Sequence, residues 1–384
     1  MSENNLKYDL LIIGGGPGGY VAAIRASQLG LNVGLVEREN LGGVCLNWGC
    51  IPTKALLRSS EVKHLLDNSK SYGFSIPDYK VNFEDIIKRS RTVAKSLSSG
   101  VEHLMKKNKI NVHNGTAKII ESNKDQKVIK VIDKEKKELK ITSKFLIIAT
   151  GATSKNLPFV SSDGKNILDY RTAMTPTELP KSLIVVGSGA IGSEFASFYN
   201  DLGCKVTIIA RSNQLLRAQD GEISQKFTEA FTNNVDVHLG THVELVAEND
   251  DGKINLTCKT STEKISISSD MLLIATGRAP ASDDLNLGDT DISVKNGYIV
   301  TDAQMRTNVP GVFALGDVTN PNQLKHAANA EARIVSHNLI NASTPMTVDL
   351  DPLPYAIFTN PQIAAVGMTE EELQSLGTEY VKGC

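Results

Sequence analysis

The chain has few cysteines, no long apolar run and no block of like charges, and each absence argues against a class of protein. Five cysteines are spread over 384 residues, and the first residues lack the apolar core of a secretory leader, so a small disulfide-stapled secreted domain is disfavoured. No apolar stretch approaches the roughly 18 residues of a membrane span. The 41 basic and 43 acidic residues nearly cancel, without a run typical of a nucleic-acid-binding arm. We therefore expect a cytoplasmic protein of two or three domains, without nucleic-acid or membrane partners.

Two of the cysteines, Cys45 and Cys50, lie in a glycine-rich segment. On an ideal helix their Cα atoms would be about 8.6 Å apart, whereas a disulfide requires roughly 4.4–6.8 Å. The two can bond only if the backbone departs from a helix between them, and the neighbouring glycines allow this. Pro52 predicts a helix that begins near Cys50. Because a helix N-terminus lowers the pKa of a cysteine, one thiol of the reduced pair is expected to be a reactive thiolate.

Other interpretations of the pair are a structural disulfide, two buried free thiols and a zinc site. No histidine or other cysteine lies within ten residues of the pair, so a zinc site would lack further ligands nearby. The first two interpretations stay open on spacing alone. We favour redox chemistry because of the expected thiolate.

A glycine loop precedes the cysteine pair. It follows a short apolar strand, 8–13, and opens a helical stretch that extends to Leu29, after which a second strand, 32–36, leads to Glu37. The glycines with the G-x-G-x-x-G spacing are Gly14, Gly16 and Gly19. Strand, loop, helix, strand and acid together are typical of a dinucleotide-binding unit, in which the acid accepts from a ribose hydroxyl.

The same arrangement occurs a second time. An apolar strand at 182–186 is followed by a second set of glycines, Gly187, Gly189 and Gly192. Gly187 lies 173 residues after Gly14, and Gly203 lies 173 residues after Gly30. The chain therefore contains two dinucleotide-binding units.

The position equivalent to Glu37 in the second unit is Ala210, so the ribose-binding acid is missing there. Arg211 follows directly, and Arg217 stands six residues later. An acid would repel a 2′-phosphate, whereas arginines bind one bidentately. The second nucleotide is thus expected to be NADP(H) rather than NAD(H); the alternative is that both arginines are solvated loop residues.

The remaining segments predict how the two units are connected. A helical stretch covers 81–109, and alternating residues from 116 to 148 predict a meander of strands. The strand 145–149 ends in Thr150-Gly151 and the strand 272–275 ends in Thr276-Gly277, so we expect residues 149–278 to be inserted into the first domain. The apolar strand before Asp317 then places an acid where it could meet the ribitol or pyrophosphate of a cofactor, or simply serve a turn.

At this point the residues resemble those of the dihydrolipoamide dehydrogenases, within the flavoprotein pyridine nucleotide-disulfide oxidoreductase family. The resemblance covers essentially all 384 residues. It rests on the segments 19–25, 42–54, 187–196 and 311–317 and on the two Thr-Gly strand endings. It implies an α/β fold with two Rossmann-like domains: an FAD domain formed by 1–148 and 279–348, an NAD(P) domain at 149–278, and the beginning of an α+β interface domain at 349–384.

The resemblance also implies the site. Cys45 would be the thiol that exchanges with the dithiol substrate, and Cys50 the thiolate beside the flavin. Lys54 would lie near the flavin N5 with Glu194 as its ion-pair partner, although a plain structural salt bridge is the alternative. Glu37 would bind the adenosine ribose of FAD and Asp317 its ribitol. The implied cofactor-binding glycines are Gly14, Gly16, Gly19, Gly151, Gly187, Gly189, Gly192 and Gly277.

Two departures from the family pattern are visible. A dihydrolipoamide dehydrogenase usually has a glutamate at the position of Ala210, and the two arginines are similar to those of NADPH-dependent glutathione reductases. Moreover, none of the seven histidines stands in the family's C-terminal His-Glu motif, because residues 349–384 match only the opening of the interface domain. We therefore expect that the chain as given does not dimerise normally or complete the lipoamide reaction.

Three functional hypotheses follow. The first is FAD-dependent oxidation of dihydrolipoamide carried by the lipoyl domains of 2-oxo acid dehydrogenase complexes or of the glycine cleavage system, with NAD(P) as acceptor and a homodimer as the full-length form. The second is an NADPH-dependent disulfide reductase of the glutathione reductase type. The third is an incomplete flavin-binding fragment with only diaphorase activity.

Overall fold

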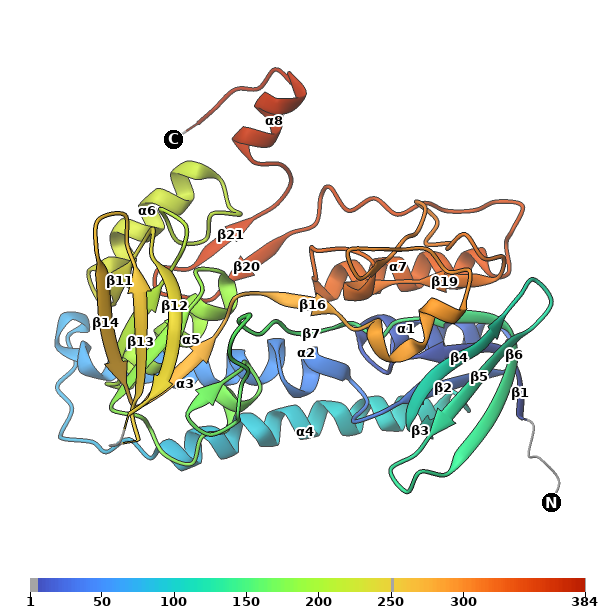
Figure 1. Cartoon of the computed structure of the whole chain (residues 1–384), viewed down its shortest axis with the longest axis horizontal. Coiled ribbons are helices and arrows are strands. Elements are labelled where there is room, and N and C mark those ends of the chain that lie inside the picture. Colours follow the sequence, from blue (N-terminus) through green and yellow to red (C-terminus); the bar gives the residue numbers. More distant parts are fainter. Residues whose placement is uncertain (1–5, 250–251, 384) are drawn as a thin grey trace. The chain divides into compact units, whose positions relative to one another are not determined.

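The computed structural model describes residues 6–249 and 252–383, and these form two compact units (Figure 1). The first contains the described residues up to Cys50 together with Ala94–Thr153 and Ala279–Leu353, and the second contains Ile51–Val93, Ser154–Arg278 and the residues from Pro354 onward. The domain boundaries expected from the sequence remain a prediction.

The first unit is built on a seven-stranded sheet in the order β3-β2-β1-β6-β5-β4, with β19 also paired to β6. Its strands are β1 (Leu6–Ile13), β2 (Val33–Glu37), β3 (Asn111–Asn114), β4 (Thr116–Ser122), β5 (Lys127–Ile132), β6 (Glu138–Ile148) and β19 (Val312–Ala314). Strands β3, β2, β1 and the second half of β6 run parallel to one another and to β19. The first half of β6 pairs antiparallel with β5, and β5 with β4, as the predicted meander requires.

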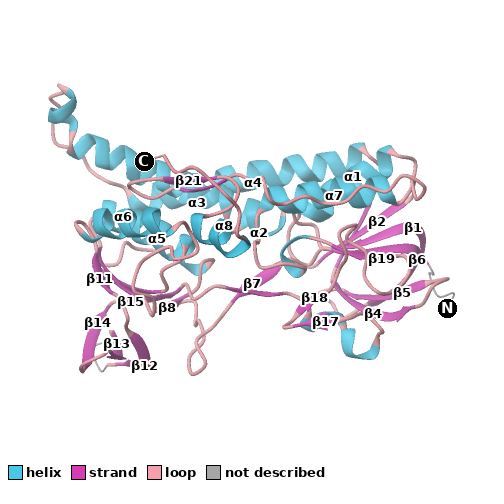
Figure 2. Ribbon diagram, turned by 90° about the horizontal axis from the view of Figure 1, so that it is seen from above, coloured by secondary structure: helices cyan, strands magenta, loops and turns pink. Residues whose placement is uncertain are grey.

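Helices α1 (Pro17–Gln28) and α7 (Lys325–Asn338) pack against each other beside this sheet (Figure 2). The small residues of α1, among them Ala22 and Ala26, are fully buried, which lets the two helices approach closely. Strand β1 is apolar on both faces, because Leu10, Leu11 and Ile12 have no exposed surface. A parallel strand covered on both sides requires this pattern.

The second unit contains a five-stranded parallel sheet in the order β11-β10-β9-β15-β8 and a separate antiparallel sheet, β12-β13-β14. The parallel strands are β8 (Ile167–Leu168), β9 (Ser182–Val186), β10 (Lys205–Ile209), β11 (Asp236–His238) and β15 (Met271–Ile274). The antiparallel ones are β12 (His242–Glu248), β13 (Ile254–Lys259) and β14 (Lys264–Ser269). One core cluster joins the two sheets, since Ile184 and Leu272 pack with Leu256 and Cys258.

Helices α5 (Ala190–Asp201) and α6 (Gly221–Thr232) belong to the second unit, as do β20 (Tyr355–Ile357), β21 (Ile363–Ala365) and α8 (Glu370–Leu376). Helix α8 starts at a capping box, in which Thr369 and Glu372 each accept the backbone N–H of the other. The remaining elements are α2 (Gly43–Asn47), α3 (Cys50–Asp67), α4 (Phe83–Lys107), β7 (Ala152–Ser154), β16 (Arg278–Pro280), β17 (Val294–Lys295) and β18 (Tyr298–Ile299). Short 3₁₀ turns lie at Ser69–Tyr72, Thr172–Met174, Asp283–Leu285, Leu287–Asp289 and Gly316–Val318.

The internal repeat predicted from the glycine spacing is present in three dimensions. Helix α5 begins and ends 173 residues after α1. The backbone bonds around the two loops also correspond: Gly14 N donates to Val36 O at 2.8 Å, and Gly187 N donates to Ile209 O at 3.0 Å. The predicted α/β fold with two Rossmann-like parallel sheets is thus confirmed. Within the described residues, no helix combines the length and the apolar character of a membrane span.

Candidate active site

The first glycine loop has the geometry of a phosphate cradle. Gly14 has φ +106°, and a Cβ atom there would lie 2.3 Å from Ala149 O, so only glycine fits. A Cβ on Gly19 would lie 1.8 Å from Gly14 O, which shows how closely α1 approaches the loop. Gly16 is the N-cap of α1 and has open space beside it, with the nearest atom 3.9 Å from its Cβ position. The positive end of the helix is therefore accessible to a pyrophosphate.

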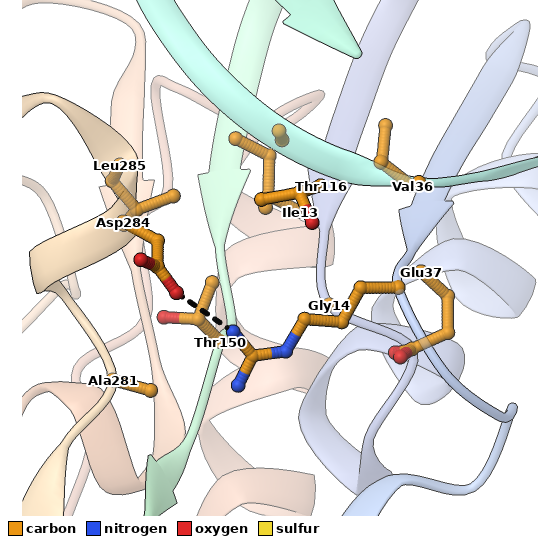
Figure 3. Close-up of a pocket in the computed structure, with 12 residues that line it drawn as sticks. Ile13, Gly14, Val36, Glu37, Thr116, Thr150, Ala281, Asp284 and Leu285 are labelled. Atoms are coloured by element: carbon orange, nitrogen blue, oxygen red, sulfur yellow. Dashed lines mark hydrogen bonds and ion pairs between the residues drawn. The ribbon is translucent and has the colours of Figure 1, made fainter. Parts of the chain in front are cut away.

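A cavity lies beside this loop at the end of β1 and β2 (Figure 3). Its space, including the part that is open to solvent, is about 450 Å³. Figure 3 shows Glu37 and Gly14 on one side and Ala281, Asp284 and Leu285 on the other. The remaining lining residues are Ile13, Val36, Arg38, Gly115, Thr116, Ala117 and Thr150.

Four polar side chains define the chemistry of this cavity. The Glu37 carboxylate accepts the backbone N–H groups of Gly15 and Glu39, both at 2.7 Å, so it is already anchored where a ribose acid is expected. Arg38 donates to Asp284 at 2.9 Å, the dashed contact in Figure 3. Among the described residues, the buried Thr150 hydroxyl has no hydrogen-bond partner, and a bound ligand with hydroxyl groups would satisfy it.

Cys45 and Cys50 lie on two different helices. Cys45 is in the single turn α2, whose C-cap residue Trp48 has φ −140°, and Cys50 is the first residue of α3. The break between the helices is the departure from a continuous helix that the spacing argument requires. The start of α3 at Cys50 confirms the helix that Pro52 predicts near that residue. Both residues are thiols in this structure.

The surroundings of Cys45 shift the pKa of its thiol. The hydrogen bond to Cys50, and then burial, raise the pKa of Cys45 well above its ordinary value, while the Lys325 ammonium opposes this rise.

The exposure of the two cysteines differs from what the resemblance implies. Cys45 is buried, with 7 % of its surface exposed, whereas Cys50 is exposed. A thiol that exchanges with substrate needs access. In this structure the accessible residue is Cys50.

Asn47 holds the cysteine segment in place, and sequence reasoning missed it. Its side-chain amide donates to the carbonyls of Leu41 and Gly43 at 3.0 and 2.9 Å, and its Oδ1 accepts from the Ser98 hydroxyl at 2.8 Å. Asn47 is 8 % exposed. The only signal in the sequence is a polar amide between the two cysteines, and its partner Ser98 lies far away in the chain.

A second positioning residue that the sequence did not reveal is Glu331. It is fully buried in α7 and accepts the backbone N–H of Gly316 at 2.6 Å and Asn320 Nδ2 at 3.1 Å. These bonds fix the 3₁₀ turn Gly316–Val318, which follows β19 and carries Asp317. Burial raises the pKa of Glu331, and the bond from Gly316 opposes this.

Lys54 lies one helical turn after Cys50 on α3 and is paired with Glu194 of α5. Both carboxylate oxygens accept from Lys54 Nζ, at 2.7 and 2.8 Å. The side chain of Glu194 is 8 % exposed and that of Lys54 is 36 % exposed. Phe358 adds a backbone N–H to Glu194 at 3.0 Å and places its ring 4.9 Å from Lys54 Nζ. Phe358 has no signature in the sequence that predicts this contact.

The second glycine loop repeats the first. Gly187 has φ +131°, and its Cβ would lie 2.2 Å from Ala275 O, while Gly189 caps α5 with open space beside it. A Cβ on Gly192 would lie 2.6 Å from Gly187 O, so α5 approaches this loop closely, as α1 does the first loop. Arg211 and Arg217 are exposed in the loop after β10.

Gly151 follows strand β6 of the first sheet, and Gly277 follows strand β15 of the second sheet. Both have positive φ, +74° and +115°, and a Cβ on either would meet nothing within 4 Å. Each directly precedes one of the two paired short strands, Gly151 before β7 and Gly277 before β16. Here the requirement for glycine is conformational and not steric.

Comparison with known proteins agrees with this architecture. The pyridine nucleotide-disulphide oxidoreductase family matches residues 8–333. The dihydrolipoyl dehydrogenase of Zymomonas mobilis is 40% identical over 377 residues, which cover 96% of this chain and 79% of that protein. The dihydrolipoyl dehydrogenase of Rhizobium etli is 39% identical over 400 residues, with 98% and 81% covered.

Two solved structures are also similar. LpdA from Mycobacterium tuberculosis has a TM-score of 0.88 at 26% identity and covers 96% of this chain and 80% of its own. The flavoprotein disulfide reductase RclA from Escherichia coli, solved as a Cu(II) complex, has a TM-score of 0.83 at 29% identity, with 97% and 79% covered. The chain therefore belongs to the pyridine nucleotide-disulphide oxidoreductase family, in the enzyme class of the dihydrolipoyl dehydrogenases.

Proposed function

We propose that the protein oxidises protein-bound dihydrolipoamide to lipoamide by dithiol–disulfide exchange at Cys45 and Cys50, with NAD(P)⁺ as the final acceptor. The observation that carries the proposal is the placement of Cys45 on α2 and of Cys50 at the first residue of α3, with a break between the two helices. Two cysteines so placed can cycle between a disulfide and a dithiol without a large rearrangement.

The first unit offers a site that suits FAD. The open Gly16 end of α1 would take the pyrophosphate, Glu37 and the unpaired Thr150 hydroxyl would face the adenosine ribose, and Asp317 would bind the ribitol. FAD supplies a two-electron carrier between the thiols and the nicotinamide. The second glycine loop, at Gly187, Gly189 and Gly192, would hold the nicotinamide nucleotide.

The thiol chemistry balances within the chain and its substrate. A thiolate of dihydrolipoamide attacks the Cys45 sulfur of the oxidised pair, and the Cys45–Cys50 bond breaks with its electron pair leaving on Cys50. The second substrate thiol then displaces Cys45, so that lipoamide closes its disulfide and Cys45 takes up a proton. The end state has one proton on Cys45 and one negative charge on Cys50, and the raised pKa of Cys45 supports this proposal.

Lys54 and Glu194 support this step by holding a positive charge near the two cysteines. The bidentate ion pair keeps the Lys54 ammonium in one place, one turn after Cys50 on the same helix. A held cation stabilises negative charge that develops during electron transfer.

The exposure of Cys50 is reconciled with its proposed role if FAD covers it. We expect alkylation of the reduced, FAD-stripped protein to label Cys50 first, and alkylation of the reduced, FAD-loaded protein to label Cys45 first. Peptide mass spectrometry after brief iodoacetamide treatment measures this. Label on Cys50 in both forms would contradict the assignment of the two roles.

The function itself is tested by turnover of dihydrolipoamide with NAD⁺ and with NADP⁺ on FAD-loaded protein. Cys45→Ser and Cys50→Ser should each abolish turnover, while Cys204→Ser, a change at a buried thiol in the second unit, should not. Turnover that survives loss of Cys45 would refute the proposal.

The proposed partners follow from this substrate. Lipoyl domains of 2-oxo acid dehydrogenase complexes or of the glycine cleavage system would present the dithiol, in the cytoplasm, and a homodimer is the proposed assembly of the full-length form. An NADPH-dependent disulfide reductase is the second candidate, because Ala210 stands where the ribose-binding acid would be.

A further inference from the structure

The cavity beside the first glycine loop has two exposed residues among the twelve that line it, Arg38 and Asp284. Their side chains are 40 % and 68 % exposed, whereas the other ten residues are buried or half-buried. The buried residues therefore form the walls and floor of the cavity. Arg38 and Asp284 stand where the cavity opens to solvent.

These two residues form an ion pair across the opening. Arg38 directly follows strand β2, whereas Asp284 belongs to the 3₁₀ turn Asp283–Leu285, 246 residues further along the chain. Arg38 Nη1 lies 2.9 Å from Asp284 Oδ2, the dashed contact in Figure 3. The pair therefore joins the two sides of the cavity at its solvent end.

The backbone on the Arg38 side of the opening is held in place. Glu37, which precedes Arg38, accepts the backbone N–H groups of Gly15 and Glu39, both at 2.7 Å. The end of β2 is thus tied to the glycine loop, and the Arg38 side chain extends from a fixed point.

The backbone on the Asp284 side is held as well. Leu285, which follows Asp284, is buried in the hydrophobic core of the first unit. The next residue, Asn286, donates from its side-chain amide to Ile119 O of strand β4 at 3.3 Å. Because both backbones are anchored, rotation of two exposed side chains is sufficient to open or close the cavity.

We propose that the ion pair between Arg38 and Asp284 is a latch across this cavity, which slows both the entry and the release of the adenosine half of FAD. The inference rests on the proposed FAD site of the first unit. An exposed ion pair shifts an equilibrium by at most about fivefold, so the latch sets the rates of exchange without preventing it. The pair is present in the closed state with or without FAD and is broken only while FAD passes. The latch therefore changes both rates equally and leaves the affinity unchanged.

The test follows flavin fluorescence after FAD is mixed with the FAD-stripped protein, and after the FAD-loaded protein is diluted. Asp284→Asn removes the charge and keeps the shape of the side chain. We expect this variant to raise the association and dissociation rate constants by about two- to fivefold each, with the same Kd. Asp283→Asn is the matched control, because Asp283 is an exposed acid of the same turn that does not line the cavity, and it should change neither rate.

Salt and charge reversal test the electrostatic origin of the effect. Added salt should raise both rates of the parent protein toward those of Asp284→Asn and should leave that variant unchanged. Asp284→Arg places two like charges at the opening and should raise both rates. Combining it with Arg38→Asp restores an ion pair of reversed polarity and should bring the rates back toward those of the parent.

Two results would overturn the latch and leave the proposed FAD site intact. Rates unchanged by Asp284→Asn would mean that the pair does not control the opening. A rise in the dissociation rate alone would mean that Asp284 contacts bound FAD directly. Failure of the parent protein to bind FAD at all would instead overturn the FAD site on which the inference rests.

Discussion

The ion pair between Lys54 and Glu194 gives a quantitative prediction for stability. Lys54→Met leaves the Glu194 carboxylate, which is 8 % exposed, with the Phe358 N–H as a remaining donor. Breaking a buried pair in this way costs about 3–5 kcal/mol. Water reaches the lysine end, whose side chain is 36 % exposed, so we reduce the expected loss in the free energy of unfolding to about 2 kcal/mol.

The complementary change is milder. Glu194→Gln keeps an oxygen that can accept from Phe358, and the freed ammonium can be hydrated, so we expect a loss of about 1 kcal/mol. The double variant should lose less than the sum of the two, by about 1 kcal/mol. Arg58→Met is a control on the same helix, because Arg58 and its partner Glu61 are exposed, and it should cost less than about 0.5 kcal/mol.

Urea unfolding followed by far-UV circular dichroism measures all four variants. A loss for Lys54→Met no larger than that for Arg58→Met would refute the reasoning, and so would strict additivity in the double variant. The first result would mean that Glu194 is solvated, and the second that the two charges do not interact.

Three further predictions concern the positioning residues and the first glycine loop. Asn47→Ala removes three hydrogen bonds and should lower the free energy of unfolding by about 2–3 kcal/mol, against about 1 kcal/mol for Ser98→Ala; equal losses in denaturant titrations would contradict the central place of Asn47. Gly14→Ala, whose Cβ would lie 2.3 Å from a carbonyl oxygen, should abolish FAD retention on gel filtration, whereas Gly30→Ala, also at positive φ but with nothing within 4 Å, should only lower stability. Burial raises the folded-state pKa of Glu331 above 4.5, so the folded chain binds this proton more tightly and the free energy of unfolding falls as pH rises from about 4.5 through the folded pKa; Glu331→Gln should flatten this part of the stability curve measured by urea unfolding at several pH values, and an unchanged curve would contradict it.

Much of the fold could be predicted from local sequence signals. The glycine spacing and the apolar strands determine backbone geometry within a few residues, so the helices α1 and α5 and the offset of 173 residues between them follow directly. The meander and the helix that begins at Cys50 follow from alternation and from Pro52.

The parts that sequence reasoning missed depend on contacts between distant residues. Asn47 meets Ser98, Glu331 meets Gly316, and Phe358 meets Glu194. None of these pairs has a fixed spacing. The relative burial of Cys45 and Cys50 likewise depends on how α2 packs, which no local pattern encodes.

The most direct test of the account is an anaerobic reductive titration of the FAD-loaded protein with dihydrolipoamide and then dithionite. A disulfide and a flavin each accept two electrons, so the account predicts that the parent protein takes up twice as many reducing equivalents per FAD as Cys45→Ser or Cys50→Ser does, and that dihydrolipoamide reduces only the parent. Equal uptake by the parent and both variants would contradict it, because the two cysteines would then not form a redox-active pair in this chain.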